Sequence, residues 1–275
     1  MSESVPCFSS RAQDSEESLN SPVISSDFQE ITARSRFSLK TLTFTGVNLT
    51  RENSTPYARV FRRRPIKDNT PDARFIQICE FLRSSKILGR ITIPCSWNEN
   101  SETDIPTEIS AWLRYTQLPA SQIDIEFTEH YIASDDRAIT YTLAALRDLG
   151  AGLILSGMGH SQTSLTLLRD RTFSALITGI TLDRHLFMRQ RSHVHSEYIL
   201  AAALLGLARD LKLSTRAEGI CSLETLHFLQ EHGCEEGCGN LLHPSESLPE
   251  FLRRSRSPKA NIAPENSGGQ TANEK

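Results

Sequence analysis

The sequence from Ala151 to Leu165 constrains this chain more than any other stretch. An apolar run, Ala151 to Leu155, ends in Ser156 and Gly157 and is followed by a turn rich in Ser and Thr. This order predicts a buried strand, a tight glycine loop and the start of a helix. In a barrel of alternating strands and helices, such a loop lies at the carboxyl end of its strand, where catalytic groups are usually placed. A hydrolase that uses hard metal ions would carry carboxylates there, and this loop carries none.

Composition indicates an ordinary globular protein. The 275 residues are 38% hydrophobic and 23% charged, with a formal net charge of -3. Such a charge creates no field that would gather nucleic acid, and no apolar run is long enough to span a bilayer. The N-terminus lacks the basic start and apolar stretch of a secretory signal. We therefore expect a cytoplasmic protein with reduced cysteines and with no membrane or direct nucleic-acid partner.

Apolar periodicity divides the chain into three parts. Residues 1–36 and 255–275 are polar and aperiodic, so both are predicted to be disordered tails. Residues 37–254 alternate short apolar runs with helical patterns, which predicts an α/β fold with a parallel sheet, open or closed into a barrel. Within this domain, strands are expected at 39–44, 57–61, 91–93, 123–127, 151–155, 175–182 and 214–217, and helices at 108–118, 134–149, 198–211 and 223–229.

Three short motifs in the second half of the chain follow one another in a recognisable order. They are Ile125-Glu-Phe-Thr-Glu129, Leu182-Asp-Arg184 and Ala217-Glu-Gly219. In order and spacing they resemble the Glu-Ile-Thr-Glu, Ile-Asp-Arg and Ala-Glu-Gly-Val-Glu-Thr motifs of the bacterial EAL domain. That family is a TIM-type (β/α) barrel that hydrolyses cyclic di-GMP with two divalent metal ions. The resemblance therefore implies a TIM-type barrel over residues 37–254.

The same resemblance assigns positions to a site. Two family glutamates are kept, as Glu126 and Glu218. Other family positions carry different residues: Tyr57 for the Glu of the family name, Pro94 for the metal-binding Asn, Ser156 and Gly157 for the paired Asp, Thr181 for the Lys, Cys221 for the second Glu of Glu-Gly-Val-Glu, and Cys238 for the late Gln. Because two Mg²⁺ ions need several hard oxygen ligands each, the resemblance implies a degenerate domain without metal, cofactor or hydrolysis.

The leading expectation is an inactive regulator that acts by binding an unknown protein in bacterial signalling, such as motility or biofilm control. It would bind cyclic di-GMP weakly or not at all. One alternative is a cyclic di-GMP receptor without hydrolysis, in which Arg62 and Arg63 would contact phosphate. Another alternative is a residual cyclic di-GMP phosphodiesterase.

A further alternative is a thiol or zinc sensor. Cys95, Cys221 and Cys238 are expected near the carboxyl ends of strands, with His160 and His243 on loops of the same face. Sulfur and imidazole ligands suit zinc, although cysteine is also a common small buried residue.

Overall fold

The computed structural model describes residues 31–51, 89–95, 105–128, 137–159, 163–187, 194–253 and 258–262. Its strands are β1 (Ile31–Ser38), β2 (Phe44–Arg51), β3 (Arg90–Pro94), β4 (Ile123–Thr128), β5 (Gly152–Met158), β6 (Gly179–Leu182), β7 (Ser214–Ala217), β8 (Glu236–Gly237) and β9 (Glu246–Ser247). Its α-helices are α2 (Ile105–Thr116), α3 (Arg137–Asp148), α4 (Thr163–Arg169), α5 (Arg171–Leu176), α6 (Val194–Asp210), α7 (Leu223–Glu231) and α8 (Leu248–Leu252). Two short 3-10 helices, η2 (Ala120–Gln122) and η4 (Arg184–Phe187), complete the elements.

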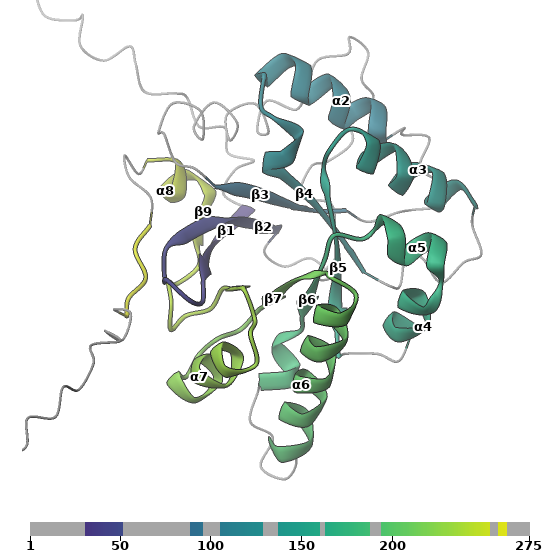
Figure 1. Ribbon diagram of the computed structural model, residues 1–275. Coiled ribbons are helices and arrows are strands. Elements are labelled where there is room, and N and C mark those ends of the chain that lie inside the picture. The colour runs from purple at the N-terminus through teal and green to yellow at the C-terminus, as the bar shows by residue number, and fades with distance from the viewer. Residues whose placement is uncertain are drawn as a thin grey trace, which may run out of the picture.

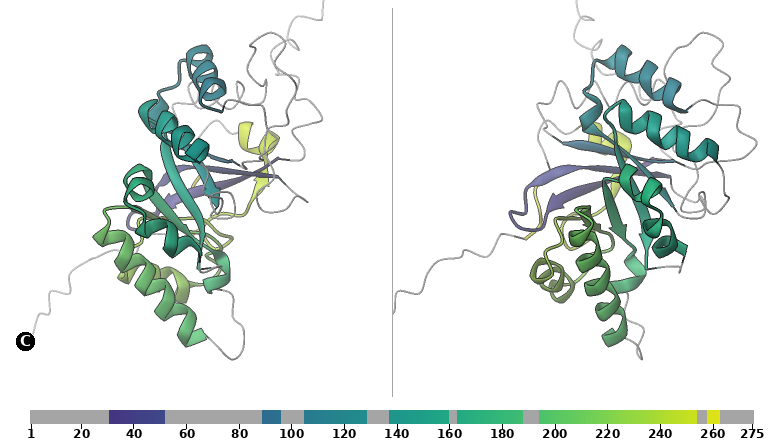
Figure 2. Two further views of the ribbon diagram at one scale, coloured as in Figure 1. Left: turned by 90° about the vertical axis from the view of Figure 1, so that its right-hand side faces the viewer. Right: turned by 45° about the vertical axis from the view of Figure 1, so that its right-hand side comes forward.

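Eight strands close into a barrel, which confirms the predicted TIM-type fold. The strand order runs from β2 through β8 to β1, and β1 also pairs with β2 and so closes the ring. All neighbours from β2 to β8 are parallel, whereas β1 is antiparallel to both of its neighbours. Helices α2 to α7 lie around the outside of the strands, and α8 lies beside β1 and β9 (Figures 1 and 2).

The apolar core lies between the barrel and its helices. The strands alternate along their length, so that Ile123, Ile125 and Phe127 of β4 face outward and are almost fully buried. Helix α3 meets this surface with Leu143 and Leu146, which are both fully buried. The chain leaves α3 at Gly150, whose φ of 94° is a conformation that glycine adopts readily.

The structure corrects the predicted limits of the domain. Residues 31–36, assigned to the disordered tail, form most of β1, because Ile31 and Ala33 are buried against the barrel. At the other end, residues 258–262 lie against the core, with Ile262 packed on it. The predicted strand at 39–44 is instead the turn between β1 and β2, and the predicted strand at 57–61 lies outside the described residues.

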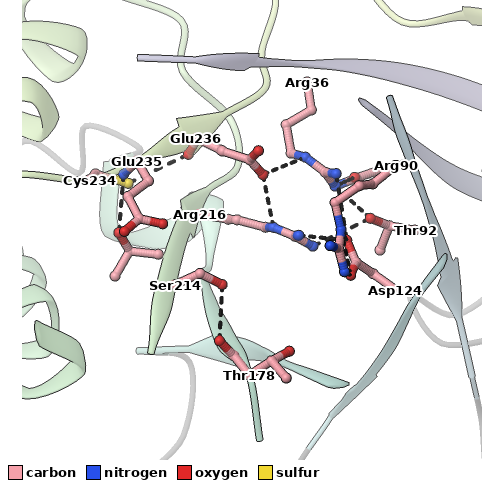
Figure 3. Close-up of polar contacts among 12 residues, drawn as sticks. Arg36, Arg90, Thr92, Asp124, Thr178, Ser214, Arg216, Cys234, Glu235 and Glu236 are labelled. Carbon is pink, nitrogen blue, oxygen red and sulfur yellow. Dashed lines mark hydrogen bonds and ion pairs between the residues drawn. The ribbon is translucent and has the colours of Figure 1, made fainter. Parts of the chain in front are cut away.

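The interior of the barrel is polar, unlike the apolar layers that fill most TIM barrels. The buried carboxylate of Asp124 accepts hydrogen bonds from Arg90 Nε at 3.0 Å and from Arg216 Nη2 at 2.5 Å (Figure 3). Arg36 Nη2 lies 3.6 Å from the same carboxylate. Glu236 forms an ion pair with Arg36, with 2.7 Å between Nε and the carboxylate, and accepts a hydrogen bond from Arg216 Nε at 3.1 Å. Arg36, Arg90, Asp124, Arg216 and Glu236 are called the ionic cluster below.

Two glycines make room for the ionic cluster. A Cβ atom at Gly152 would overlap the Asp124 carboxylate and the Arg90 guanidinium. A Cβ atom at Gly46 would overlap the Arg36 guanidinium and the backbone of Arg90. The glycines on β2 and β5 therefore allow large charged side chains from neighbouring strands to occupy the barrel axis.

The β1–β2 hairpin is expected to contribute strongly to stability. Phe37 is fully buried and its ring meets Phe44 edge-on, with 6.2 Å between centroids. A Phe37→Ala change should lower the free energy of unfolding by about 3–5 kcal/mol, because it opens a cavity in the core. Tyr141→Ala, at a side chain that is 74% exposed, serves as control and should change it by less than about 0.5 kcal/mol. Equal urea midpoints for the two variants would show that the hairpin contributes little.

The charge of Asp124 should also be essential to stability. Burial alone would raise its pKa, but the hydrogen bonds from Arg90 and the charges of Arg216 and Arg36 outweigh burial and lower it. Asp124→Asn should cost about 3–5 kcal/mol at pH 7, since it leaves Glu236 as the one carboxylate of the ionic cluster facing the buried guanidiniums of Arg36 and Arg216. Asp210→Asn, on the exposed end of α6, is the matched control.

The pH dependence of unfolding gives a second measurement. Because the folded pKa of Asp124 is lowered, its stabilisation is complete above the ordinary value of 3.8 and is lost as pH falls through the folded value. The difference in unfolding free energy between the wild type and Asp124→Asn should therefore shrink below about pH 4. A difference that stays constant down to pH 2 would contradict a charge-based role.

Candidate functional site

Two retained glutamates lie at the carboxyl ends of the barrel strands. Glu126 is on β4 and Glu218 directly follows β7, and both side chains are half-buried. Burial raises the pKa of Glu126 to about 7, and the negative charge of Glu218 adds to this effect. The pKa of Glu218 is also raised, mainly by burial, although the positive charges of Arg34 and Arg184 and a hydrogen bond from Asn48 oppose the rise. A carboxyl group with a pKa near 7 can exchange a proton at neutral pH.

The other positions that the resemblance assigned, where they are described, surround the same mouth. Pro94 ends β3 and pairs in register with Glu126. Ser156 and Gly157 belong to β5 itself rather than to a loop after it, and the strand is irregular there, with φ of 79° at Gly157. The Ser156 hydroxyl donates to the carbonyl of Phe127 at 3.3 Å. Thr181 lies buried on β6.

Four residues that the sequence had suggested for this mouth lie outside the described residues. They are Tyr57, Arg62, Arg63 and His160. The strand beside β3 is β2, and its inward residue Asn48 reaches Glu218, with 3.5 Å between Asn48 Nδ2 and Glu218 Oε1. Asn48 therefore occupies the place in the barrel for which the sequence had suggested Tyr57.

The sequence reasoning missed Asn48 and Arg34. Arg34 was assigned to the disordered tail, and Asn48 fell between the strands predicted at 39–44 and 57–61. The alternation of Val47 and Leu49, both buried, around polar Asn48 was the available signal for an inward-facing position on a barrel strand.

The described side chains at the mouth do not fit a pair of divalent metal ions. Among the described residues, no three His, Cys, Asp or Glu side chains converge as metal ligands. The oxygen donors near Glu126 are Glu218, the Asn48 amide and the Thr181 hydroxyl, whereas Mg²⁺ keeps near-octahedral oxygen coordination. No chemical step can therefore be derived through a metal ion from these residues.

Among the described residues, no three His, Cys, Asp or Glu side chains are grouped so that they could hold a metal ion, and this search includes the cysteines of the zinc hypothesis. Cys95 is half-buried, Cys221 is exposed and Cys238 is buried. Burial raises the pKa of Cys238 to about 12. His243 Nδ1 lies 2.8 Å from the carbonyl of Pro244. The zinc hypothesis gains no support from the described residues.

Within the described part of the chain, no helix combines the length and hydrophobicity that a membrane span requires. The cytoplasmic location stays a prediction.

Comparison with known proteins places the chain in a family. The EAL domain model matches residues 68–245. The chain is 29% identical over 194 residues to the cyclic di-GMP phosphodiesterase PA2567 of Pseudomonas aeruginosa, which covers 70% of this chain and 32% of that protein. It is 31% identical over 142 residues to the cyclic di-GMP phosphodiesterase RocR of the same organism, covering 52% and 34%. The chain thus spans about a third of the length of these relatives.

Solved structures agree on the fold. A PaMucR phosphodiesterase in complex with c-di-GMP matches with a TM-score of 0.63 at 20% identity, covering 80% of this chain and 98% of that one. The cAMP-bound EAL enzyme Bd1971 matches with a TM-score of 0.64 at 20% identity, covering 82% and 66%. At this identity the likeness shows the barrel architecture alone.

The comparisons correct one prediction. The chain was predicted not to be an enzyme, but relatives that match most of its length are named cyclic di-GMP phosphodiesterases, and the family replacements by themselves do not show inactivity. What is supported is an EAL barrel of the cyclic di-GMP signalling family. With the family model matching residues 68–245, this chain belongs to the EAL domain family.

Proposed function

We propose that this chain binds cyclic di-GMP at the carboxyl-terminal mouth of its barrel, as part of a signalling system that uses this nucleotide. The observation that carries the proposal is the presence of two arginines beside Glu218. Arg34 of β1 and Arg184 of η4 both lie close enough to Glu218 for their positive charges to oppose the rise in its pKa that burial causes. Family membership supplies the nucleotide, since the relatives are named for it.

The two arginines suit the two phosphates of a cyclic dinucleotide. A guanidinium offers several N–H donors in a fixed fork that matches phosphate oxygens. Arg184 is exposed and Arg34 is half-buried, so both can reach a ligand at the mouth. A Cβ atom at Gly219, whose φ is 74°, would overlap Arg184. The glycine therefore allows Arg184 to lie close to the residue that follows Glu218.

The retained glutamates oppose the same ligand. Glu126 and Glu218 would repel phosphate wherever both are ionised, because no metal-binding set surrounds them among the described residues. Thr181 offers a hydroxyl rather than a cation on β6. The balance of two arginines against two glutamates favours an affinity for cyclic di-GMP weaker than micromolar.

Titration calorimetry with cyclic di-GMP tests the proposal, with linear product assayed in the same samples. Arg184→Gln and Arg34→Gln should each weaken binding by roughly tenfold, since a hydrogen bond to a charged group contributes about 1.5–3 kcal/mol. Glu126→Gln should strengthen binding by removing a repulsive charge. Glu231→Gln changes an exposed residue of α7, so it is the matched control and should leave the affinity unchanged.

Two outcomes would count against this assignment, and a third would extend it to hydrolysis. Affinity that is unchanged in both arginine variants would place the nucleotide elsewhere. A submicromolar isotherm that is abolished by Arg62→Ala and Arg63→Ala would transfer the phosphate contact to those residues. Linear product that disappears in Glu126→Gln would show that the mouth is a hydrolytic site and not a binding site alone.

Regulation through a protein partner stays a second candidate. Ile199 and Leu200 of α6 are 59% and 39% exposed, and exposed apolar side chains of this size are common in partner surfaces. A partner recovered with the full chain should be lost with Ile199→Glu and retained with Tyr141→Glu, which alters an apolar side chain on α3. Equal recovery with both variants would exclude α6 as the contact.

A further inference from the structure

A second polar pocket lies at the opposite end of the barrel from Glu126 and Glu218. It has a volume of about 360 Å³ and is lined by residues at the amino ends of the parallel strands. Arg90 begins β3, Gly152 begins β5 and Ser214 begins β7. The mouth residues lie further along the same strands toward their carboxyl ends, with Glu126 two residues beyond Asp124 and Glu218 two residues beyond Arg216.

The ionic cluster forms the inner wall of this pocket and carries an excess of positive charge. Arg90, Asp124, Arg216 and Glu236 line it, and Arg36 lies behind them (Figure 3). Within the cluster three guanidiniums face two carboxylates, and the Glu126 carboxylate beyond it also interacts with the positive charges of Arg216 and Arg36. A buried or half-buried net charge is costly unless an ion of opposite sign lies nearby.

The carboxylates of the cluster already interact with its arginines, whereas the Arg90 guanidinium has a donor that its contacts with Asp124 do not use. Asp124 accepts from Arg90 and Arg216 through both of its oxygens, so it has little capacity left to bind or repel a ligand. Arg90 uses Nε and Nη2 for Asp124 and is 38% exposed. Its remaining Nη1 can therefore donate to a group in the pocket.

The rim of the pocket adds a further cation. Arg147, in the last turn of α3, is exposed, and no ion pair joins it to any described residue. The opposing charge at the rim is Glu235, which is exposed to solvent. The hydroxyl of Ser121 in η2 also lines the pocket. The glycines at 150 and 152 keep side chains out of the space between these groups.

We propose that this amino-terminal pocket binds a phosphoryl group, either free phosphate or a small phosphorylated molecule. A tetrahedral dianion can accept hydrogen bonds from Arg90 and Arg147 at once and neutralises the surplus charge of the ionic cluster. A carboxylate presents only two oxygens in one plane and one charge, so it satisfies fewer of these donors. The pocket volume exceeds what one phosphate group fills, which leaves space for an attached small organic part.

Titration of the full chain with inorganic phosphate at constant ionic strength tests this site, with chloride and acetate as comparison anions. Phosphate should bind and raise the thermal midpoint, and acetate should bind roughly tenfold more weakly because it makes fewer charged hydrogen bonds. Binding should be the same in the presence of saturating cyclic di-GMP, because the barrel mouth lies at the other end. Competition between the two ligands would place phosphate at the mouth and overturn the proposal.

The variants separate this site from general attraction of anions. Arg147→Gln, at an exposed position, should fold normally and weaken phosphate binding by roughly tenfold. Ser121→Asp should also weaken it by adding a negative charge to the rim. Arg169→Gln alters an exposed arginine in the last turn of α4, outside the pocket, and should leave binding unchanged. No binding above chloride, or equal loss in the Arg147 and Arg169 variants, would refute the site.

Discussion

The fold depends on one buried carboxylate. Asp124 is fully buried and receives guanidinium groups from β1, β3 and β7, which are far apart along the chain. Each of these arginines would be costly inside the barrel without a counter-charge. The same contact requires glycine at 46 and 152, where any side chain would displace a guanidinium or the carboxylate. The ionic cluster thus determines which residues the neighbouring strands can carry on their inner faces.

This cluster also divides the barrel electrostatically. At the amino-terminal end, three arginines outnumber two carboxylates. At the carboxyl-terminal end, burial raises the pKa of both Glu126 and Glu218, and the charge of Glu218 adds to the rise at Glu126 while Arg34 and Arg184 oppose the rise at Glu218. A phosphate therefore meets attraction at the end where TIM barrels seldom place chemistry, and a mixture of attraction and repulsion at the end where they usually do. The two ends of this barrel are suited to different ligands.

The sequence predicted much of the outer barrel and little of its axis. Alternation in Ile123-Asp-Ile-Glu-Phe127 correctly indicated a strand with polar residues facing the barrel interior, since periodicity is a local property. Arg36 was placed in a disordered tail because the composition of residues 1–36 is polar. Strand β1 pairs with its neighbour β2 and also with β8, and the contact with β8 is distant in sequence, so local composition cannot report it. The partners of Asp124 could not be predicted for the same reason.

The packing of the barrel and the chemistry of its mouth depend on different residues. Outward residues such as Ile91, Phe127 and Leu153 are buried and build the packing of the barrel. Inward residues such as Asn48 and Glu218 determine what the mouth can bind, and they can change without disturbing that packing. The closed barrel brings an amide of β2 to 3.5 Å from Glu218, at the long end of the hydrogen-bond range. The barrel therefore determines which groups surround Glu218, and the chemistry of the mouth follows from those groups.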